Sequence, residues 1–453
     1  MFQRFFDEGL AQASFLVGCD RTKQAVVIDP RRDAAIYTAA ARQLGATIAT
    51  AIETHVHADF VSGARELAHA GARVFTGPGA DLEYPHHETH DGETLAVGDV
   101  RLTFLHTPGH TWEHIAILAE APGEPVRLFT GDLLFVGGVG RPDLLGEAQT
   151  RQLASDLFDS LNRIMTLDDR VEIHPGHGAG SLCGAGIGRE PSSTIGRERS
   201  QNALLRHRDR DAFITAVLAD IPATPPYFAR MKRVNKAGAA LLDERRPLPS
   251  IRPAAAAALS ADGAIILDLR PAAAFTAGHP YGALNFAYGP KVGFWAGWVV
   301  PPDEPLLLLA DDPAHVAEAA MQLLRVGLDG IEGVIAGGFE AWIGAGLPVA
   351  EIARISAAEL RSAILTGNRD GLRIVDVRTP HEFQGDHVDG SVNIPVGDIP
   401  ARARELAGAG PVATICEGGY RSSLAASLLA HEGVAHPINV DGGMTAYRAL
   451  ETT

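Results

Sequence analysis

The fold of the first half of the chain is decided by Thr54-His55-Val56-His57-Ala58-Asp59-Phe60. This stretch ends a β-rich run, residues 47–54, and precedes a helical pattern that begins near Asp59. Residues two apart in an extended segment point to the same side, so His55 and His57 can converge on one point, which Asp59 reaches from the helix start. The stretch predicts a metal site. Because a single His-x-His also arises by chance, the rest of the chain has to decide.

Three later strands end in further candidate ligands. His110, Asp132 and His177 each follow a glycine shortly after an apolar run. Glycine lets the backbone turn sharply, so the side chain that follows can face a common cleft. The apolar runs are residues 101–105, 126–129 and 171–173. Because four separate strand ends each deliver His or Asp, we favour a metal site over chance clustering.

Residues 1 to about 245 resemble the metallo-β-lactamase fold, an α/β sandwich of αββα layers whose mark is His-x-His-x-Asp-His, Gly-His, Gly-Asp and a late His. Within that superfamily the motifs are most similar to those of the persulfide dioxygenases. The motifs are Thr-His-x-His-Ala-Asp at 54–59, Thr-Pro-Gly-His-Thr at 107–111, Thr-Gly-Asp-Leu-Leu at 130–134 and Gly-Arg-x-Asp at 140–143. The resemblance implies one Fe(II) per chain, held by His55, His110 and Asp132. It places His57, Asp59 and His177 around these ligands, where they would orient them through hydrogen bonds.

Phe60 departs from the superfamily pattern. Hydrolytic relatives such as glyoxalase II usually hold two metals, with a histidine at this position for the second one. A phenyl ring offers no lone pair, which favours a single-metal site. Two imidazoles and one carboxylate on Fe(II) leave positions open for O₂ and a substrate sulfur. A zinc-dependent thioester hydrolase of glyoxalase II type stays open as the alternative.

Other residues of the first domain have two interpretations each. Arg141 is expected to bind the anionic end of the substrate, with a surface ion pair to Asp143 as the alternative. Cys183, six residues after His177, either lies near the cleft or is a buried inert thiol. Basic residues between 189 and 236 indicate a solvated helical face, with helices expected near 201–207 and 211–219, or a dock for glutathione or coenzyme A.

The second half contains an internal repeat. Asp268-Leu269-Arg270 matches Asp376-Val377-Arg378, and 376 − 268 = 108; Asn285 matches Asn393 at the same spacing. With a Gly-Gly-x-x-Ala-aromatic motif in both copies, the repeat resembles the rhodanese family, small α/β domains that transfer sulfane sulfur. We therefore expect three domains, at residues 1–250, 251–350 and 354–453.

The sulfur chemistry is expected in the second rhodanese copy. An apolar strand at 411–415 runs into Cys416, and a helix begins near Arg421. Backbone N–H groups of the loop, including those of Gly418 and Gly419, and the helix N-terminus favour an anion there, which should lower the thiol pKa. Related phosphatases have five residues between Cys and Arg; the four found here favour sulfur over phosphate. Ala310 and His315 stand opposite Cys416 and Arg421, so the first copy lacks the nucleophile.

Bulk properties exclude several function classes. A net charge of −16 over 453 residues argues against nucleic acid or an anionic membrane as partner. No apolar run approaches a membrane span, no secretory signal is visible, and three scattered cysteines do not form a disulfide framework. These observations predict a cytoplasmic protein. They leave open whether it forms a homo-oligomer.

Taken together, the chain resembles a persulfide dioxygenase–rhodanese fusion of sulfide detoxification. The resemblance implies oxidation of a glutathione or coenzyme A persulfide by O₂ to sulfite. It also implies that Cys416 carries sulfur as a persulfide, with Arg421 beside it, and forms or uses thiosulfate. The direction of sulfur transfer and the thiol carrier cannot be read from the sequence.

Overall fold

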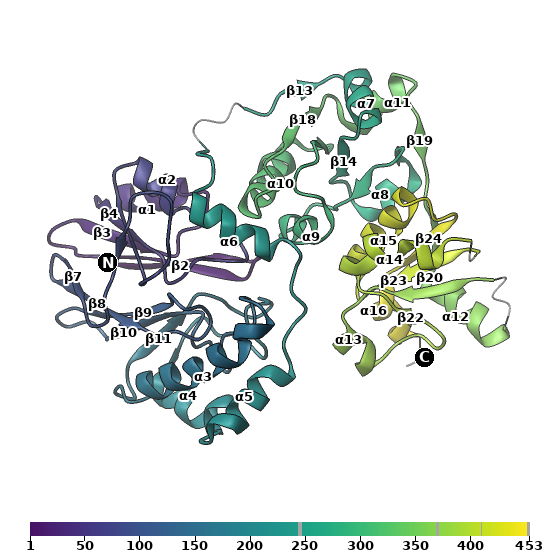
Figure 1. Cartoon of the computed structure of the whole chain (residues 1–453). Coiled ribbons are helices and arrows are strands. Elements are labelled where there is room, and N and C mark those ends of the chain that lie inside the picture. Colours follow the sequence, from purple (N-terminus) through teal and green to yellow (C-terminus); the bar gives the residue numbers. More distant parts are fainter. Residues whose placement is uncertain (243–246, 368–370, 409, 451–453) are drawn as a thin grey trace. The chain divides into compact units, whose positions relative to one another are not determined.

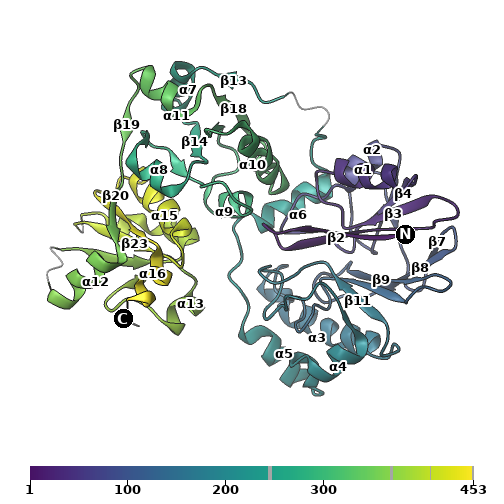
Figure 2. The same ribbon diagram turned by 180° about the vertical axis from the view of Figure 1, so that it is seen from behind.

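The computed structural model describes residues 1–242, 247–367, 371–408 and 410–450, so the last three residues of the third expected domain lie outside it. The chain divides into two compact units (Figures 1 and 2). The first comprises Met1–Arg246 and Leu324–Gly327, and the second Pro247–Leu323 and Leu328–Thr453. Within the described ranges, no helix is long and apolar enough to cross a membrane.

Two six-stranded sheets form the centre of the first unit. The first contains, in spatial order, β1 (Phe2–Asp7), β2 (Gln12–Gly18), β3 (Gln24–Ile28), β4 (Thr47–Ile52), β5 (Arg73–Thr76) and β6 (His87–Glu88). The second contains β12 (Ser193–Thr194), β11 (Glu172–Pro175), β10 (Arg127–Gly131), β9 (Ile115–Glu120), β8 (Val100–His106) and β7 (Thr94–Val97). Alternate residues such as Phe15, Phe104 and Phe129 are buried between the sheets, as the period of two along a strand requires.

Helices cover both outer faces of this pair of sheets (Figure 1). Helices α1 (Ala35–Gln43) and α2 (Ala64–His69) pack on the first sheet through Tyr37 and Leu67, respectively. Helices α3 (Glu147–Ile164) and α5 (Arg210–Ala219) pack on the second sheet through Leu157 and Phe213, respectively. The remaining helices are α4 (Ile195–Gln201), the 3₁₀ turn η1 (Leu204–Arg206) and α6 (Phe228–Ala237). The layers are therefore αββα.

Two helix predictions were wrong at their boundaries. The helix expected from Asp59 begins only at Ala64. Asn235 of α6 forms hydrogen bonds with the backbone of the loop that precedes α2. It donates to the carbonyls of His57 and Phe60 (2.8 Å each) and accepts from the Ser62 N–H (2.8 Å).

The helix expected at 201–207 is also wrong. Helix α4 ends at Gln201, and Asn202 is extended. The Asn202 side chain donates to the carbonyl of Gly138 at 3.1 Å and accepts from the Leu204 N–H at 3.1 Å. Such side-chain bonds to the backbone compete with helix continuation.

The second unit holds two sheets with the same strand order. The first contains β13 (Ser250–Ile251), β18 (Ile331–Ile335), β17 (Leu306–Leu309), β14 (Ile265–Asp268) and β16 (Leu284–Asn285). The second contains β20 (Ala353–Ser356), β24 (Pro437–Asp441), β23 (Val412–Ile415), β21 (Arg373–Asp376) and β22 (Val392–Asn393). Their strands are parallel, and β14, β17 and β23 are fully buried, which explains continuous apolar runs such as Leu306–Leu309. The repeat seen in the sequence is thus present in the topology.

Helices flank each of these sheets (Figure 2). They are α7 (Pro253–Ala261), α8 (Ala272–Ala277), α9 (Val292–Val299), α10 (Pro313–Arg325) and α11 (Gly338–Gly344) in the first copy. In the second copy they are α12 (Ala357–Thr366), α13 (Pro380–Gly385), α14 (Ile399–Arg402), α15 (Tyr420–His431) and α16 (Gly443–Ala449), with the 3₁₀ turns η2 (Val396–Asp398) and η3 (Ala403–Leu406). A short ribbon of β15 (His279–Pro280) and β19 (Val349–Ala350) completes the unit.

Candidate metal centre and Cys416 loop

The structure brings His55, His110 and Asp132 together from three loops that follow β4, β8 and β10. One ligand atom from each lies within 4.8 Å of the other two. The carboxylate Oδ2 of Asp132 is 3.5 Å from His110 Nε2 and 3.9 Å from His55 Nε2. Two metal bonds of about 2.1 Å set ligand atoms roughly 3–3.5 Å apart, so the cluster needs only a small contraction to hold one ion.

Two of these atoms lack any other partner. Among the described residues, neither His55 Nε2 nor Asp132 Oδ2 has a hydrogen-bond partner, and both residues are buried. Leaving buried polar atoms unpaired is costly, whereas a bound cation would satisfy both at once. The residues present therefore fit a resident metal ion.

Hydrogen bonds on the far side of each ring fix the ligand tautomers. His110 Nδ1 lies 2.8 Å from the carbonyl oxygen of Arg141, which can only accept, so Nδ1 donates and Nε2 keeps its lone pair. Thr54 gives its hydroxyl proton to Asp29 (2.9 Å) and must accept from His55 Nδ1 (2.9 Å). Burial lowers the pKa of both rings, which favours the neutral form that binds metal.

Asp59 and His177 reach the ligand Asp132 through a short chain. His177 lies 2.7 Å from Asp59 Oδ2 through Nε2 and 2.7 Å from Asp132 Oδ1 through Nδ1. Burial disfavours the charged ring, but the negative charges of Asp132 and Asp59 outweigh it and raise the His177 pKa well above its usual value. The imidazolium thus holds one oxygen of Asp132 and leaves Oδ2 for an ion.

His57 is held by two buried carboxylates that the sequence did not single out. Its Nε2 lies 3.1 Å from Asp29 Oδ1 and 3.3 Å from Glu53 Oε2. Burial lowers the His57 pKa, but Asp29 and Glu53 outweigh it and raise the pKa well above the usual value. Both acids stand at the ends of neighbouring strands, β3 and β4, which was the available signal. The expected orienting role of His57 stays a prediction.

Phe60 is fully buried and packs on His57, with ring centroids 4.4 Å apart. Nearby, Asp59, His177 and Cys183 form a second group of atoms that could hold an ion. Cys183 is buried, and burial raises the pKa of its thiol to about 12, so the thiol stays protonated near neutral pH. Both interpretations of Cys183 therefore hold in part, since it lies near the cluster and is buried.

Arg141 is buried and fully engaged. It forms a two-pronged ion pair with Asp143, with both N···O distances 2.7 Å, and donates to Thr224 Oγ1 at 2.7 Å. Only 3% of its surface is exposed. The structure thus shows the ion pair with Asp143 that was the alternative, except that Arg141 is buried and does not lie on the surface. Binding of a substrate anion by Arg141 stays a prediction.

Two buried groups near the ligands escaped the sequence interpretation. His114 accepts the backbone N–H of Asp132 at 3.1 Å, and burial lowers its pKa to about 3. Lys232 of α6 buries its Nζ without a hydrogen-bond partner among the described residues, and burial lowers its pKa to about 8. The nearness of His114 to His110 in the chain was a usable signal. Lys232 was not distinguishable within a basic stretch.

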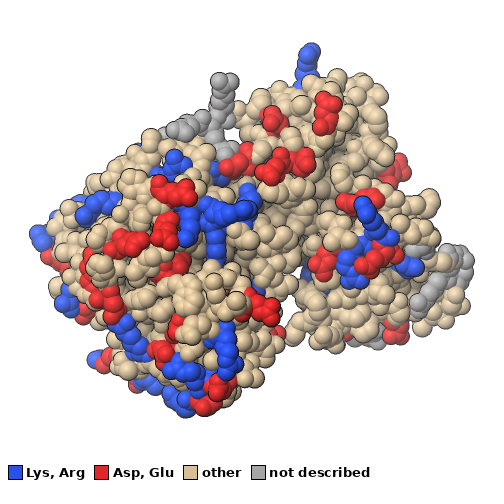
Figure 3. Space-filling model, in the orientation of Figure 1, with Lys and Arg blue, Asp and Glu red and all other residues tan. Residues whose placement is uncertain are grey.

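Four of the other basic residues of that stretch form ion pairs with acids. The pairs are Arg197–Glu190, Arg199–Asp169, Arg210–Asp159 and Lys236–Asp81. On the face drawn in Figure 3, blue and red side chains lie intermixed. This arrangement favours the solvated face over a dock for an anionic carrier.

The Cys416 loop joins β23 to α15. The N–H of Gly419, which has a left-handed φ of 101°, donates to Cys416 Sγ at 3.1 Å, and Sγ contacts Ser422 Oγ at 3.5 Å. Gly418 and Gly419 also line a cavity of about 520 Å³, a size typical of small-molecule sites. All three cysteines of the chain are free and buried.

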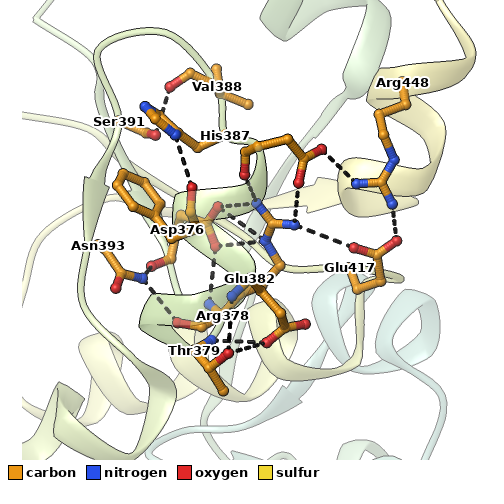
Figure 4. A network of polar contacts seen from close by, with 12 residues as sticks. Asp376, Arg378, Thr379, Glu382, His387, Val388, Ser391, Asn393, Glu417 and Arg448 are labelled. Carbon is orange, nitrogen blue, oxygen red and sulfur yellow. Dashed lines mark hydrogen bonds and ion pairs between the residues drawn. The ribbon is translucent and has the colours of Figure 1, made fainter. Parts of the chain in front are cut away.

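Carboxylates pair with Arg421 of this loop and with two arginines beside it, Arg378 after β21 and Arg448 of α16. Arg421 donates to both oxygens of Glu382, at 2.7 Å each. Figure 4 shows how Arg378 reaches Asp376 and Glu417, and how Arg448 also binds Glu417. The residue that follows Cys416 is therefore fixed from two sides.

Comparisons with known proteins agree with this architecture. A family model described as "Metallo-beta-lactamase superfamily" matches residues 7–177, and one described as "Rhodanese-like domain" matches residues 252–345 and 356–450. A crystal structure of a metallo-beta-lactamase from Staphylococcus aureus subsp. aureus COL is 34% identical, with a TM-score of 0.66, over 74% of this chain and 98% of that one. The chain belongs to the metallo-β-lactamase superfamily. The predicted fold class, with two rhodanese domains after the sandwich, is confirmed.

Two further likenesses concern the first unit of this superfamily member. A hydroxyacylglutathione hydrolase from Xanthomonas axonopodis pv. citri (strain 306) is 29% identical over 252 residues, 54% of this chain and 88% of that protein. A crystal structure of ETHE1 from Myxococcus xanthus is 29% identical, with a TM-score of 0.45, over 52% of this chain and 98% of that one. The superfamily fold binds metal ions, in keeping with the clusters described above.

Proposed function

We propose that this protein oxidises a low-molecular-weight thiol persulfide with O₂ at a single Fe(II) and transfers sulfane sulfur at Cys416. The observation that carries the proposal is the cluster of His55, His110 and Asp132 with Phe60 beside it. Three ligands of this kind suit Fe(II) and leave positions for O₂ and a sulfur ligand. Phe60 puts an apolar ring where a second metal would need a donor.

The first reaction balances as RSSH + O₂ + H₂O → RSH + SO₃²⁻ + 2 H⁺, so the terminal sulfur is oxidised and O₂ is reduced. Iron, when bound, supplies the activation of O₂ and a position for the persulfide sulfur beside it. The chain's own residues hold the geometry: His177 and Asp59 fix Asp132, while Thr54 fixes His55. The substrate class is a persulfide of glutathione or coenzyme A type.

The second reaction is Cys416–S⁻ + S₂O₃²⁻ ⇌ Cys416–S–S⁻ + SO₃²⁻. The sulfur–sulfur bond of thiosulfate breaks, a new one forms at Cys416, and the electron pair leaves on sulfite. The N–H groups of Gly418 and Gly419 and the start of α15 favour the negative charge. Fusion of the two activities in one chain raises the concentration of each product at the other site.

The test uses purified full-length protein loaded anaerobically with Fe(II). We expect about one iron per chain, and O₂ consumption with stoichiometric sulfite when glutathione persulfide is added. Coenzyme A persulfide, tested in parallel, identifies the carrier. Iron-loaded protein that consumes no O₂ with either persulfide would overturn the proposal.

A second candidate is a metal-dependent thioester hydrolase with an attached sulfur carrier. It is favoured by the relatives named hydroxyacylglutathione hydrolase and by the second donor group, Asp59, His177 and Cys183. Metal analysis separates the two candidates. Two zinc ions per chain together with hydrolysis of S-lactoylglutathione would favour the hydrolase.

A further inference from the structure

The two rhodanese copies retain one set of side chains in common. Arg270 binds Asp268 and Arg378 binds Asp376 in the same forked geometry. The equivalent asparagines also agree: Asn285 Nδ2 donates to the carbonyls of residues 268 and 270, and Asn393 Nδ2 to those of residues 376 and 378. Because the copy without a nucleophile keeps these bonds, they serve the fold.

A different set is present only in the copy that has the cysteine. Ala310 replaces Cys416, and His315 replaces Arg421. The spacing of 108 places Ala274 opposite Glu382, since 382 − 108 = 274. Glu382 is thus missing from the same copy that lacks Cys416 and Arg421. Thr379, the partner of Glu382 in its helix cap, is also replaced there, since 379 − 108 = 271 and residue 271 is proline. Glu382 therefore belongs to a set of contacts found only in the copy that has the cysteine.

The Glu382 carboxylate is held in one position by four hydrogen bonds. Both of its oxygens accept from Arg421 at 2.7 Å, and Oε2 also accepts from the N–H and the hydroxyl of Thr379 at 2.9 Å each. Burial opposes ionisation, but Arg421 and Thr379 outweigh it and lower the Glu382 pKa to about 2. The carboxylate is therefore charged near neutral pH and occupies both terminal nitrogens of the loop arginine.

We propose that Glu382 determines which sulfur donors the Cys416 site accepts, by competing with small dianions for Arg421. This inference rests on the proposed sulfur-transfer function. A fixed negative charge repels a dianion such as thiosulfate or sulfate twice as strongly as a singly charged persulfide terminus. The site then takes sulfur more readily from a thiol persulfide than from thiosulfate.

Removing the Glu382 carboxylate changes the affinity for anions in two opposite ways, and the loss of its negative charge has the larger effect. Loss of the forked pair lets Arg421 move, which weakens anion binding slightly, because partly exposed pairs contribute little. Loss of the charge removes a repulsion; in general, a single charge and a dianion separated by about 6 Å in water repel each other by an energy that corresponds to roughly a tenfold change in affinity. Glu382→Gln removes the charge and keeps the helix cap, since glutamine also serves at this position. Glu382→Asp keeps the charge and shortens the arm.

The experiment measures protection of Cys416 in the full-length protein by inorganic sulfate. Iodoacetamide labelling of Cys416, followed by mass spectrometry, gives the sulfate concentration that halves the labelling rate. This readout needs no turnover, so it separates failure of the inference from failure of the proposed function. The matched control is Glu359→Gln, because Glu359 makes the same capping box with Ser356 at the start of α12.

We expect the half-protecting sulfate concentration to fall about tenfold in Glu382→Gln, and to stay near the wild-type value in Glu382→Asp and Glu359→Gln. If sulfur transfer occurs, the KM for thiosulfate falls in Glu382→Gln while that for glutathione persulfide changes less than twofold. An unchanged or higher half-protecting concentration in Glu382→Gln would overturn the inference, as would an equal fall in Glu382→Asp.

Discussion

The metal cluster and the Cys416 loop satisfy their polar atoms in opposite ways. In the first unit, His55 Nε2 and Asp132 Oδ2 are buried without a hydrogen-bond partner among the described residues. Around Cys416, Arg378 and Arg421 are paired with carboxylates of the same domain. The first site leaves two buried atoms that an ion could bind, whereas the arginines of the second are paired by carboxylates of the chain itself. Substitutions at the two sites should therefore have separable effects.

The largest effect should come from removing a metal ligand. In His110→Ala the cluster keeps two donors, and we expect the metal content after dialysis to fall from about one ion per chain to nearly none, with loss of O₂ consumption. Elemental analysis and an oxygen electrode measure both. The control is His174→Ala, because His174 packs against Phe15 and Phe129 outside the cluster. Full metal retention in His110→Ala would show that the ion binds elsewhere.

The complementary change is Cys416→Ser. Without the thiolate, thiosulfate formation should be abolished, while metal content and sulfite production stay within about twofold of wild type, because the two sites do not share residues. Assays of sulfite and thiosulfate on the same sample measure both outputs. Cys19→Ser serves as the control for loss of a buried thiol. Loss of both products in Cys416→Ser would contradict independent sites.

A smaller and more specific effect should follow Phe60→His. The new imidazole adds a donor beside Asp59 and His177, so we expect zinc loading to rise from about one to about two ions per chain. Iron-dependent O₂ consumption should fall about tenfold as the open positions are lost. Phe60→Leu, which removes the ring without adding a donor, should stay at one ion. One zinc in Phe60→His would mean that other residues exclude the second metal.

The smallest effect is a pH dependence of stability at the Cys416 site. The Glu382 pKa is about 2 in the folded protein, below its usual 4.5, because Arg421 and Thr379 outweigh burial. A depressed carboxyl pKa stabilises the fold above about pH 4.5, and this contribution is lost as the pH falls toward 2. We expect the pair to be worth about 1 kcal/mol after solvent screening.

Calorimetry of wild type and Glu382→Gln between pH 3 and 7 measures this term. The difference in melting temperature, about 4 °C at neutral pH, should shrink below pH 4.5. Glu359→Gln should show a smaller difference in melting temperature over the same pH range. In its cap the Glu359 carboxylate accepts hydrogen bonds from Ser356, whereas Glu382 is also paired with an arginine. A Glu382→Gln difference that grows on acidification would have the wrong sign for this explanation.

Local patterns in the sequence marked the strand ends and the Cys416 loop, and the family resemblance selected the three candidate ligands among them. Strand ends carry His55, His110 and Asp132, and a strand, a glycine loop and a helix carry Cys416, so the residues that meet are each marked by their own neighbours in the chain.

What could not be predicted depends on partners distant in sequence. The Asp143 partner of Arg141 was the alternative expected from the sequence, but Thr224, which lies 83 residues after Arg141, was not foreseen. Nor was Asp29, which lies 28 residues before its partner His57. The helix expected at Asp59 starts late because Asn235 binds the loop. No periodicity or motif spacing carries that information, since each contact is made by the folded chain as a whole.

The bond between Asn235 and the ligand loop has a consequence for how the protein is made. A nascent chain that has reached Asp132 already contains all three side chains of the candidate cluster. It still lacks Asn235, which lies 175 residues after Phe60 and donates a hydrogen bond to the Phe60 carbonyl. The loop that carries His57 and Phe60 therefore gains its hydrogen bonds to Asn235 only after α6 has been synthesised, so a chain that ends before α6 lacks part of the frame around the candidate ligands.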